Sequence, residues 1–379
     1  MLFMLVLAVL VNGCGGSGAP RVLSRLRIGL GATALALAPD GHTLAVACHR
    51  SNDVWLVDMQ GPADQAPQRI DTGAKPRALL FQADKPAFFV AEGLSPNASV
   101  ALLKLDDHRV ARRYQPKGLL GRWLELPQEQ KLLAARLGEP LLGIYRSKDW
   151  HLIKAVNVGG EVTAIDQAFG SWWVATRQAD SLARLSPRDM ALQAVALAGP
   201  EPRSLAIVRA SGLAYVACQG RRGEASPLIL PTPTVTVSKL SPLDVSDTAE
   251  ALTDTAAELD DEDAADTEEL SQELNEDDAL RFAGGGIAIF RLEDTRRLDY
   301  IPLPGGPTFA LPSPDGKRLA IACGDRQLRM LDLATRKVTH LMKLGGSPGA
   351  MQLSPDGKEL WIALSNVKQL LRVAPGLGW

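Results

Sequence analysis

Short apolar runs bounded by polar turns recur along the chain at a nearly constant spacing. The clearest copies follow two Ser-Pro-Asp-Gly-Lys turns at 313–317 and 354–358, which precede the apolar runs Leu319–Cys323 and Leu360–Leu364. In such a turn Pro presets φ, Asp bonds its own backbone and Gly accepts a positive φ, so each apolar run should be a strand after a tight turn. A repeat of about 40 residues built from short strands predicts a propeller or a solenoid.

An apolar residue followed by Ala marks the second strand of every unit. The dipeptides are Val46-Ala47, Val90-Ala91, Leu133-Ala134, Val174-Ala175, Val216-Ala217, Ile321-Ala322 and Ile362-Ala363. Successive copies are separated by 44, 43, 41, 42, 105 and 41 residues. Removing one period of about 42 residues from the long step leaves an insertion of about 63 residues. The pattern therefore predicts seven units, of which the fifth carries a long extra loop.

These units resemble the YVTN-type β-propeller repeat. The local matches are Leu213–Cys218, where Cys218 stands at the family's Asn, and the third strands Val54–Asp58 and Leu328–Asp332. The resemblance runs from about residue 28 onward apart from the insertion, and units one, six and seven match best, whereas units three and four lack the Pro-Asp-Gly turn. It implies an all-β, seven-bladed propeller, which is a fold that carries many unrelated activities.

The two ends of the repeat region are complementary. The seventh unit stops after its third strand, at residues 369–373. An incomplete blade leaves an open sheet edge, which folded proteins pair or cover. Residues 21–28 alternate polar and apolar side chains, as a half-buried strand does. We therefore expect residues 21–28 to supply the outer strand of the last blade and to close the ring.

The N-terminal segment has the features of a bacterial lipoprotein. Its apolar run, Met1–Val11, is too short to span a bilayer and has the length of a signal-peptide core. Val-Asn-Gly-Cys before and at Cys14 resembles a lipobox, and the Gly/Ser stretch that follows suits a flexible tether. The alternative is an N-terminal segment with an incidental cysteine. The expected divisions are a lipoprotein-type signal peptide at 1–13, a tether at 14–20 and a propeller at 21–379, lipid-anchored in the bacterial cell envelope through Cys14.

The insertion, residues 223–283 within the fifth blade, is strongly acidic. Between Asp244 and Asp278 it holds 16 acidic residues and no basic or aromatic one. Such a segment cannot bury enough apolar surface to offset its ordering entropy, so the sequence predicts disorder. Without these 16, the remaining 27 acidic residues stand against 41 basic ones. The total charge of −2 therefore conceals a propeller that carries about +14.

No catalytic or cofactor-binding motif stands out in the sequence. It lacks a Gly-x-Ser-x-Gly elbow, a His-Glu-x-x-His pair and a Cys-x-x-Cys-His haem attachment site. Cys48, Cys218 and Cys323 close the same strand in three units, where a small buried hydrophobe is expected more than a disulfide or a metal site. We therefore expect no metal site and no cofactor.

Two classes of function remain. The first is a non-enzymatic binding or scaffold protein, anchored to a membrane, whose partner is a protein or an anionic ligand. The second follows from the resemblance, because relatives of the repeat include a lactonase-like group of hydrolases and a haem-binding group of nitrite reductases. Either would need acids, histidines or arginines that converge on the central channel. No pattern in the chain points specifically to nucleic acid.

The candidate site lies on one face of the predicted propeller. The turns between second and third strands share this face with the connections between blades, and most of these turns and connections carry cations. If the cations act together, the low-dielectric walls of the channel would focus their positive field and attract an anion. The simpler interpretation is that they are ordinary surface charges, each solvated by water. Because the acidic insertion leaves from the same face, we expect it to compete with an anionic ligand. The candidate residues are Arg50, Arg77, Arg122, Arg136, Arg177, Arg203 and Arg326.

Overall fold

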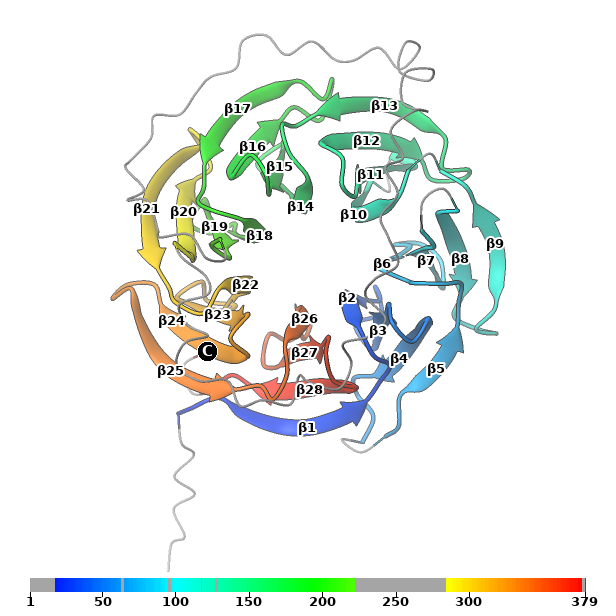
Figure 1. The fold of residues 1–379 in the computed structure, drawn as a ribbon, viewed down its shortest axis with the longest axis horizontal. Coiled ribbons are helices and arrows are strands. Elements are labelled where there is room, and N and C mark those ends of the chain that lie inside the picture. The colour runs from blue at the N-terminus through cyan, green and yellow to red at the C-terminus, as the bar shows by residue number, and fades with distance from the viewer. Residues whose placement is uncertain are drawn as a thin grey trace, which may run out of the picture.

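The protein folds into a ring of seven antiparallel four-stranded sheets, as the sequence predicts (Figure 1). The computed structural model describes residues 18–62, 65–94, 97–116, 118–126, 129–221, 284–376 and 379. Within these ranges the secondary structure consists of 28 strands, and no helix is long and apolar enough to cross a membrane. The predicted signal peptide, Cys14 and the acidic insertion at 223–283 lie outside the described residues.

The first four blades each use four consecutive strands, ordered from the channel outward. Blade one comprises β2 (Ala32–Leu37), β3 (Thr43–Cys48), β4 (Asp53–Asp58) and β5 (Gln68–Asp71). Blade two comprises β6 (Ala78–Phe81), β7 (Ala87–Glu92), β8 (Ser99–Lys104) and β9 (Val110–Tyr114). Blade three comprises β10 (Leu120–Leu126), β11 (Lys131–Arg136), β12 (Leu141–Arg146) and β13 (Leu152–Asn157). Blade four comprises β14 (Val162–Ala168), β15 (Ser171–Thr176), β16 (Ser181–Leu185) and β17 (Leu192–Leu197).

The last three blades follow the same order, except that the ring closes with the N-terminal strand. Blade five comprises β18 (Pro202–Val208), β19 (Leu213–Cys218), β20 (Gly286–Arg291) and β21 (Arg296–Pro302). Blade six comprises β22 (Pro307–Pro312), β23 (Arg318–Cys323), β24 (Gln327–Asp332) and β25 (Lys337–Lys343). Blade seven comprises β26 (Pro348–Leu353), β27 (Leu360–Leu364), β28 (Gln369–Ala374) and β1 (Arg21–Arg27).

The core consists of seven layers, one between each pair of neighbouring blades. The second strands are buried almost along their whole length, because each of their faces packs against a different blade. Trp172 packs toward blade three, whereas its neighbour Trp173 packs toward blade five. This two-sided burial explains why the second strands read as continuous apolar runs rather than as alternating ones.

The Pro-Asp-Gly turns have the geometry that their sequence predicts. In blade six the Ser313 hydroxyl lies 2.7 Å from an Asp315 carboxylate oxygen and accepts the Arg318 N–H at 2.9 Å. Gly316 has a φ of 70°, which the absence of a side chain permits. Blade seven repeats this arrangement around Ser354. These turns lie at the ends of the strands opposite to the candidate site.

The N-terminal strand closes the ring, which confirms the prediction for residues 21–28. Strand β1 pairs antiparallel with β28 and brings Leu26 opposite Leu370 (Figure 1). Ile28, just beyond the strand, donates its N–H to the Lys368 carbonyl at 3.2 Å. Leu26 and Ile28 are buried in the layer between blades seven and one, together with Trp361. The two ends of the repeat region are thereby held in one sheet.

Candidate functional site

The innermost strands place one equivalent residue from each blade at the same end of the central channel. In each blade, one residue of the innermost strand pairs with the repeated Ala of the second strand, and the residue meant here lies just before it in the chain. In blade one, for example, Ala34 pairs with Ala47, and the residue before it is Thr33. In six blades the register shifts there, as in a β-bulge, which re-aims a side chain at the end of a strand. We call the set the mouth residues: Thr33, Arg77, Arg122, Thr163, Arg203, Thr308 and Gly349.

The mouth residues lie on the face that carries the turns between second and third strands. The backbone shows this directly, because His49, in the turn between β3 and β4, donates its N–H to Gly31 just before β2, at 2.8 Å. Below the mouth, residues from all seven innermost strands line a cavity of about 380 Å³. Arg122 and Arg203 are the charged side chains among its lining residues. The channel therefore has a cationic entrance.

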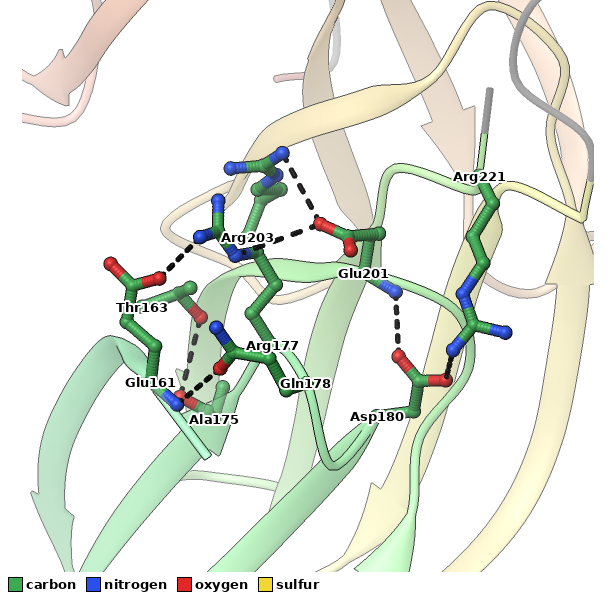
Figure 2. Close-up of polar contacts among 9 residues, drawn as sticks. All are labelled: Glu161, Thr163, Ala175, Arg177, Gln178, Asp180, Glu201, Arg203 and Arg221. Atoms are coloured by element: carbon green, nitrogen blue, oxygen red, sulfur yellow. Dashed lines mark hydrogen bonds and ion pairs between the residues drawn. The ribbon is translucent and has the colours of Figure 1, made fainter. Parts of the chain in front are cut away.

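Three of the seven predicted arginines are neutralised by carboxylates that the sequence analysis did not include. Arg136 donates to Glu139 at 3.2 Å and to the Tyr145 hydroxyl at 3.4 Å. Figure 2 shows the other two in a chain of ion pairs, in which Arg177 contacts Glu161. Glu201 continues this chain, because it lies 3.8 Å from Arg177 and 3.3 Å from Arg203 (Figure 2).

A neighbouring ion pair joins the same face to the start of the insertion. Asp180 contacts Arg221, the last described residue before the insertion, and accepts the Glu201 backbone N–H at 2.9 Å (Figure 2). Burial raises the pKa of Asp180, although the positive charge of Arg221 acts in the opposite direction. The cations of blades four and five are thus largely neutralised by carboxylates of the same face. This face is therefore less uniformly basic than the sequence predicts.

Arg122 differs from these arginines, because it forms no ion pair with a carboxylate of the described residues. Its Nε donates to the Thr163 carbonyl at 2.9 Å. Glu161, whose ion pair is with Arg177, still attracts the Arg122 guanidinium from a distance. Burial lowers the pKa of Arg122, the negative charge of Glu161 acts in the opposite direction, and the like charge of Arg203 lowers the pKa further. A half-buried cation that forms no ion pair is costly for the fold, and a bound anion would relieve that cost.

Arg77 is the second mouth arginine that forms no ion pair with a described carboxylate. Its terminal nitrogen donates to the Gly93 carbonyl at 3.1 Å and lies 3.4 Å from His49 Nε2. Its Nε is buried and has no hydrogen-bond partner among the described residues. Burial, Arg77, Lys75 and Arg50 all lower the pKa of His49, so this imidazole is neutral at pH 7. An acceptor atom from a ligand would satisfy the Arg77 Nε–H.

The last two predicted arginines lie at the rim rather than in the channel. Arg50 is exposed on the turn between β3 and β4, and Arg326 is half-buried on the turn between β23 and β24. Neither forms an ion pair with any other described residue. Of the seven predicted residues, the structure therefore brings Arg77, Arg122 and Arg203 to one ring position. Of these three, Arg77 and Arg122 form no ion pair with a carboxylate in the described part of the chain.

The three cysteines of the propeller are free and buried, at equivalent positions of their blades. Burial raises the pKa of the Cys48 and Cys323 thiols to about 12 and raises that of Cys218 as well. Among the residues that the structure describes, no group of three or more His, Cys, Asp or Glu side chains is placed to hold a metal ion. The channel mouth is therefore the strongest candidate site.

Comparisons of the sequence with known proteins do not assign the chain to a family. No protein-family model matches the chain, and a search of curated proteins finds no match. The function is therefore inferred from the geometry and charge of the site.

Proposed function

We propose that the protein is a non-enzymatic binding protein whose propeller holds an anionic ligand at the mouth of its central channel. Arg77 and Arg122 supply the main contacts, and Arg203 contributes from the other side of Thr163. The observation that carries this proposal is the Arg122 guanidinium, which is half-buried at the channel mouth and forms no ion pair with any described carboxylate. Guanidinium groups bind carboxylates and phosphates through charge-assisted hydrogen bonds.

The surroundings of the two arginines favour an anion over a cation. Arg77 keeps a buried Nε–H that has no acceptor among the described residues, and His49 beside it is neutral and adds no negative charge. The carboxylates nearest to the mouth in blades four and five are already paired with Arg177 and Arg203. An incoming anion would therefore meet uncompensated positive charge in a region of low dielectric constant.

We also propose that the protein belongs to the cell envelope and is held there by a lipid on Cys14. The support is the short apolar run, the Gly13-Cys14 pair and the Gly/Ser tether. The Ser-Pro-Asp-Gly turns and the seven-fold strand pattern further favour a relation to the YVTN-type repeat. In this arrangement the propeller would present its channel mouth to a ligand or partner outside the membrane.

The proposal is tested by thermal unfolding with inorganic phosphate at constant ionic strength. A ligand that binds the folded state stabilises it by RT ln(1 + [L]/Kd), so the midpoint should rise with phosphate concentration. Phosphate also stabilises proteins non-specifically, so the informative quantity is the difference between variants. We expect Arg122→Gln and Arg77→Gln to lose most of the shift, and the rim variant Arg50→Gln to keep it. An equal shift in all four proteins would contradict the proposal.

A further inference from the structure

We infer that the ligand is a small amphipathic anion, with one carboxylate or phosphate at the mouth arginines and an apolar body inside the channel. This inference rests on the proposed function and adds the chemical class of the ligand. It follows from what the innermost strands carry below the mouth residues, and from the size of the cavity that they enclose.

The position two residues beyond each mouth residue is apolar in every blade. Side chains two residues apart point to the same side of a strand, and two residues span about 6.6 Å. The second position thus forms a ring one layer deeper than the mouth residues. All of its members except Leu124 appear among the cavity-lining residues. We call this set the apolar ring: Leu35, Leu79, Leu124, Ile165, Leu205, Ala310 and Met351.

The apolar ring changes what an anion site at the mouth can bind. Leu79, Ala310 and Met351 are buried in the layers between blades, whereas Leu35, Leu124, Ile165 and Leu205 are only half-buried. An inorganic anion would use the arginines and leave the half-buried members of the ring in contact with water. A molecule with an apolar body covers this ring at the same time, and each buried methylene group contributes about 0.8 kcal/mol. The cavity volume of about 380 Å³ lies at the small end of the range for small-molecule pockets, about 300–1,000 Å³. A small organic anion fits this space, whereas a polymer does not.

The far side of the apolar ring disfavours a second anionic group. Glu125 on β10 and Asp166 on β14 lie one residue beyond the ring. Both carboxylates have partners, since Glu125 accepts the Ala83 N–H at 3.0 Å and Asp166 accepts from Arg209 at 3.0 Å. Neither carboxylate lines the cavity, whose lining residues beyond the ring are Leu311 and Gln352. A second anionic group would therefore lie there without a cationic partner. The channel suits a ligand with a single anionic head that enters from the arginine face.

The test is calorimetric titration of the full chain, at constant ionic strength, with acetate, butanoate and hexanoate. Burial of two additional methylene groups at about 0.8 kcal/mol each predicts roughly 15-fold tighter binding of hexanoate than of butanoate. Adipate, which has the same length but a second carboxylate, should bind more weakly than hexanoate. Octyl phosphate as a further arm separates a phosphate head from a carboxylate head.

Channel variants locate the apolar part of the ligand. Leu35→Gln and Leu205→Asn change half-buried members of the apolar ring that line the cavity. Both should reduce the preference for hexanoate over acetate while inorganic phosphate still binds. Leu298→Asn, on the exposed face of an outer strand, should leave the preference unchanged. Retained phosphate binding also shows that a variant is folded.

The outcomes separate this inference from the proposed function. If acetate and hexanoate bind equally and Arg122→Gln abolishes both, the mouth is an anion site but the amphipathic ligand is wrong. If hexanoate binds more tightly but neither channel variant reduces its advantage, the apolar body lies elsewhere and the inference is also overturned. If no anion binds the wild-type protein, the proposed function fails.

Discussion

The closing strand offers the sharpest test of the fold, because one buried side chain at its end connects the first and last blades. Ile28 is 1% exposed and packs in the layer between blades seven and one. Ile28→Ala removes three carbon atoms from this layer and leaves the backbone hydrogen bond to Lys368 intact. Loss of the N-terminal strand from blade seven would also expose the edge of β28.

The expected cost follows from the size of the deletion. Three buried carbon groups at about 0.8 kcal/mol each account for about 2.4 kcal/mol of lost transfer free energy. The residual cavity adds to this, and Ile→Ala substitutions in protein cores cost about 2–5 kcal/mol in total. We therefore expect Ile28→Ala to lower the free energy of unfolding by about 3 kcal/mol.

Urea unfolding followed by tryptophan fluorescence measures this loss, because Trp361 lies in the same layer as Ile28. The matched control is Leu23→Ala on β1, whose side chain is 40% exposed and should cost less than about 0.5 kcal/mol. An equal, small effect of both substitutions would refute the reasoning, because it would mean that the N-terminal strand does not contribute to the closed ring.

Two further predictions concern the anchor and the mouth. Expressed in a bacterial host, the protein should fractionate with membranes, and Cys14→Ser should release or misprocess it; soluble behaviour of both forms would contradict lipidation. The lowered pKa of His49 means that the unfolded chain takes up a proton first as the pH falls below about 6.5, so the fold loses stability in that window. His49→Gln should therefore lose less stability than the wild type between pH 7 and pH 5 in urea unfolding, and an identical loss would show that His49 does not titrate as the geometry requires.

Much of the fold is readable from local signals. The apolar-Ala dipeptides report second strands that are buried on both faces, and the single long step between Val216-Ala217 and Ile321-Ala322 identifies the blade with the insertion. The closing strand is predictable because the sequence leaves the last blade one strand short while residues 21–28 have strand periodicity. Each of these signals depends on residues close together in the chain or on a regular repeat.

The site was predictable only in part. Arg77 and Arg203 follow Pro76 and Pro202 at matching places, so their approach to the channel mouth is visible in the sequence. The equivalence of Arg122 is hidden, because Gly121 stands where the proline would be and the register shift of β10 conceals the alignment.

The neutralising carboxylates were missed for a different reason. Glu161 and Glu201 lie on the connections between blades, and their pairing with Arg177 depends on how successive blades are placed around the ring. The apolar ring likewise cannot be predicted from the sequence alone, because its members become equivalent only through the register of the innermost strands. A count of cations on one face cannot separate those with partners from those without.

The central claim is that the arginine mouth and the apolar ring form one site. Its most direct test is diffraction from crystals that contain 6-bromohexanoate, at a concentration set from the dissociation constant measured by calorimetry. The account predicts an anomalous bromine peak inside the channel near Ile165 and Leu205, with the carboxylate on Arg122. A peak on the outer strands, or an empty channel at a concentration that saturates the protein in solution, would contradict it.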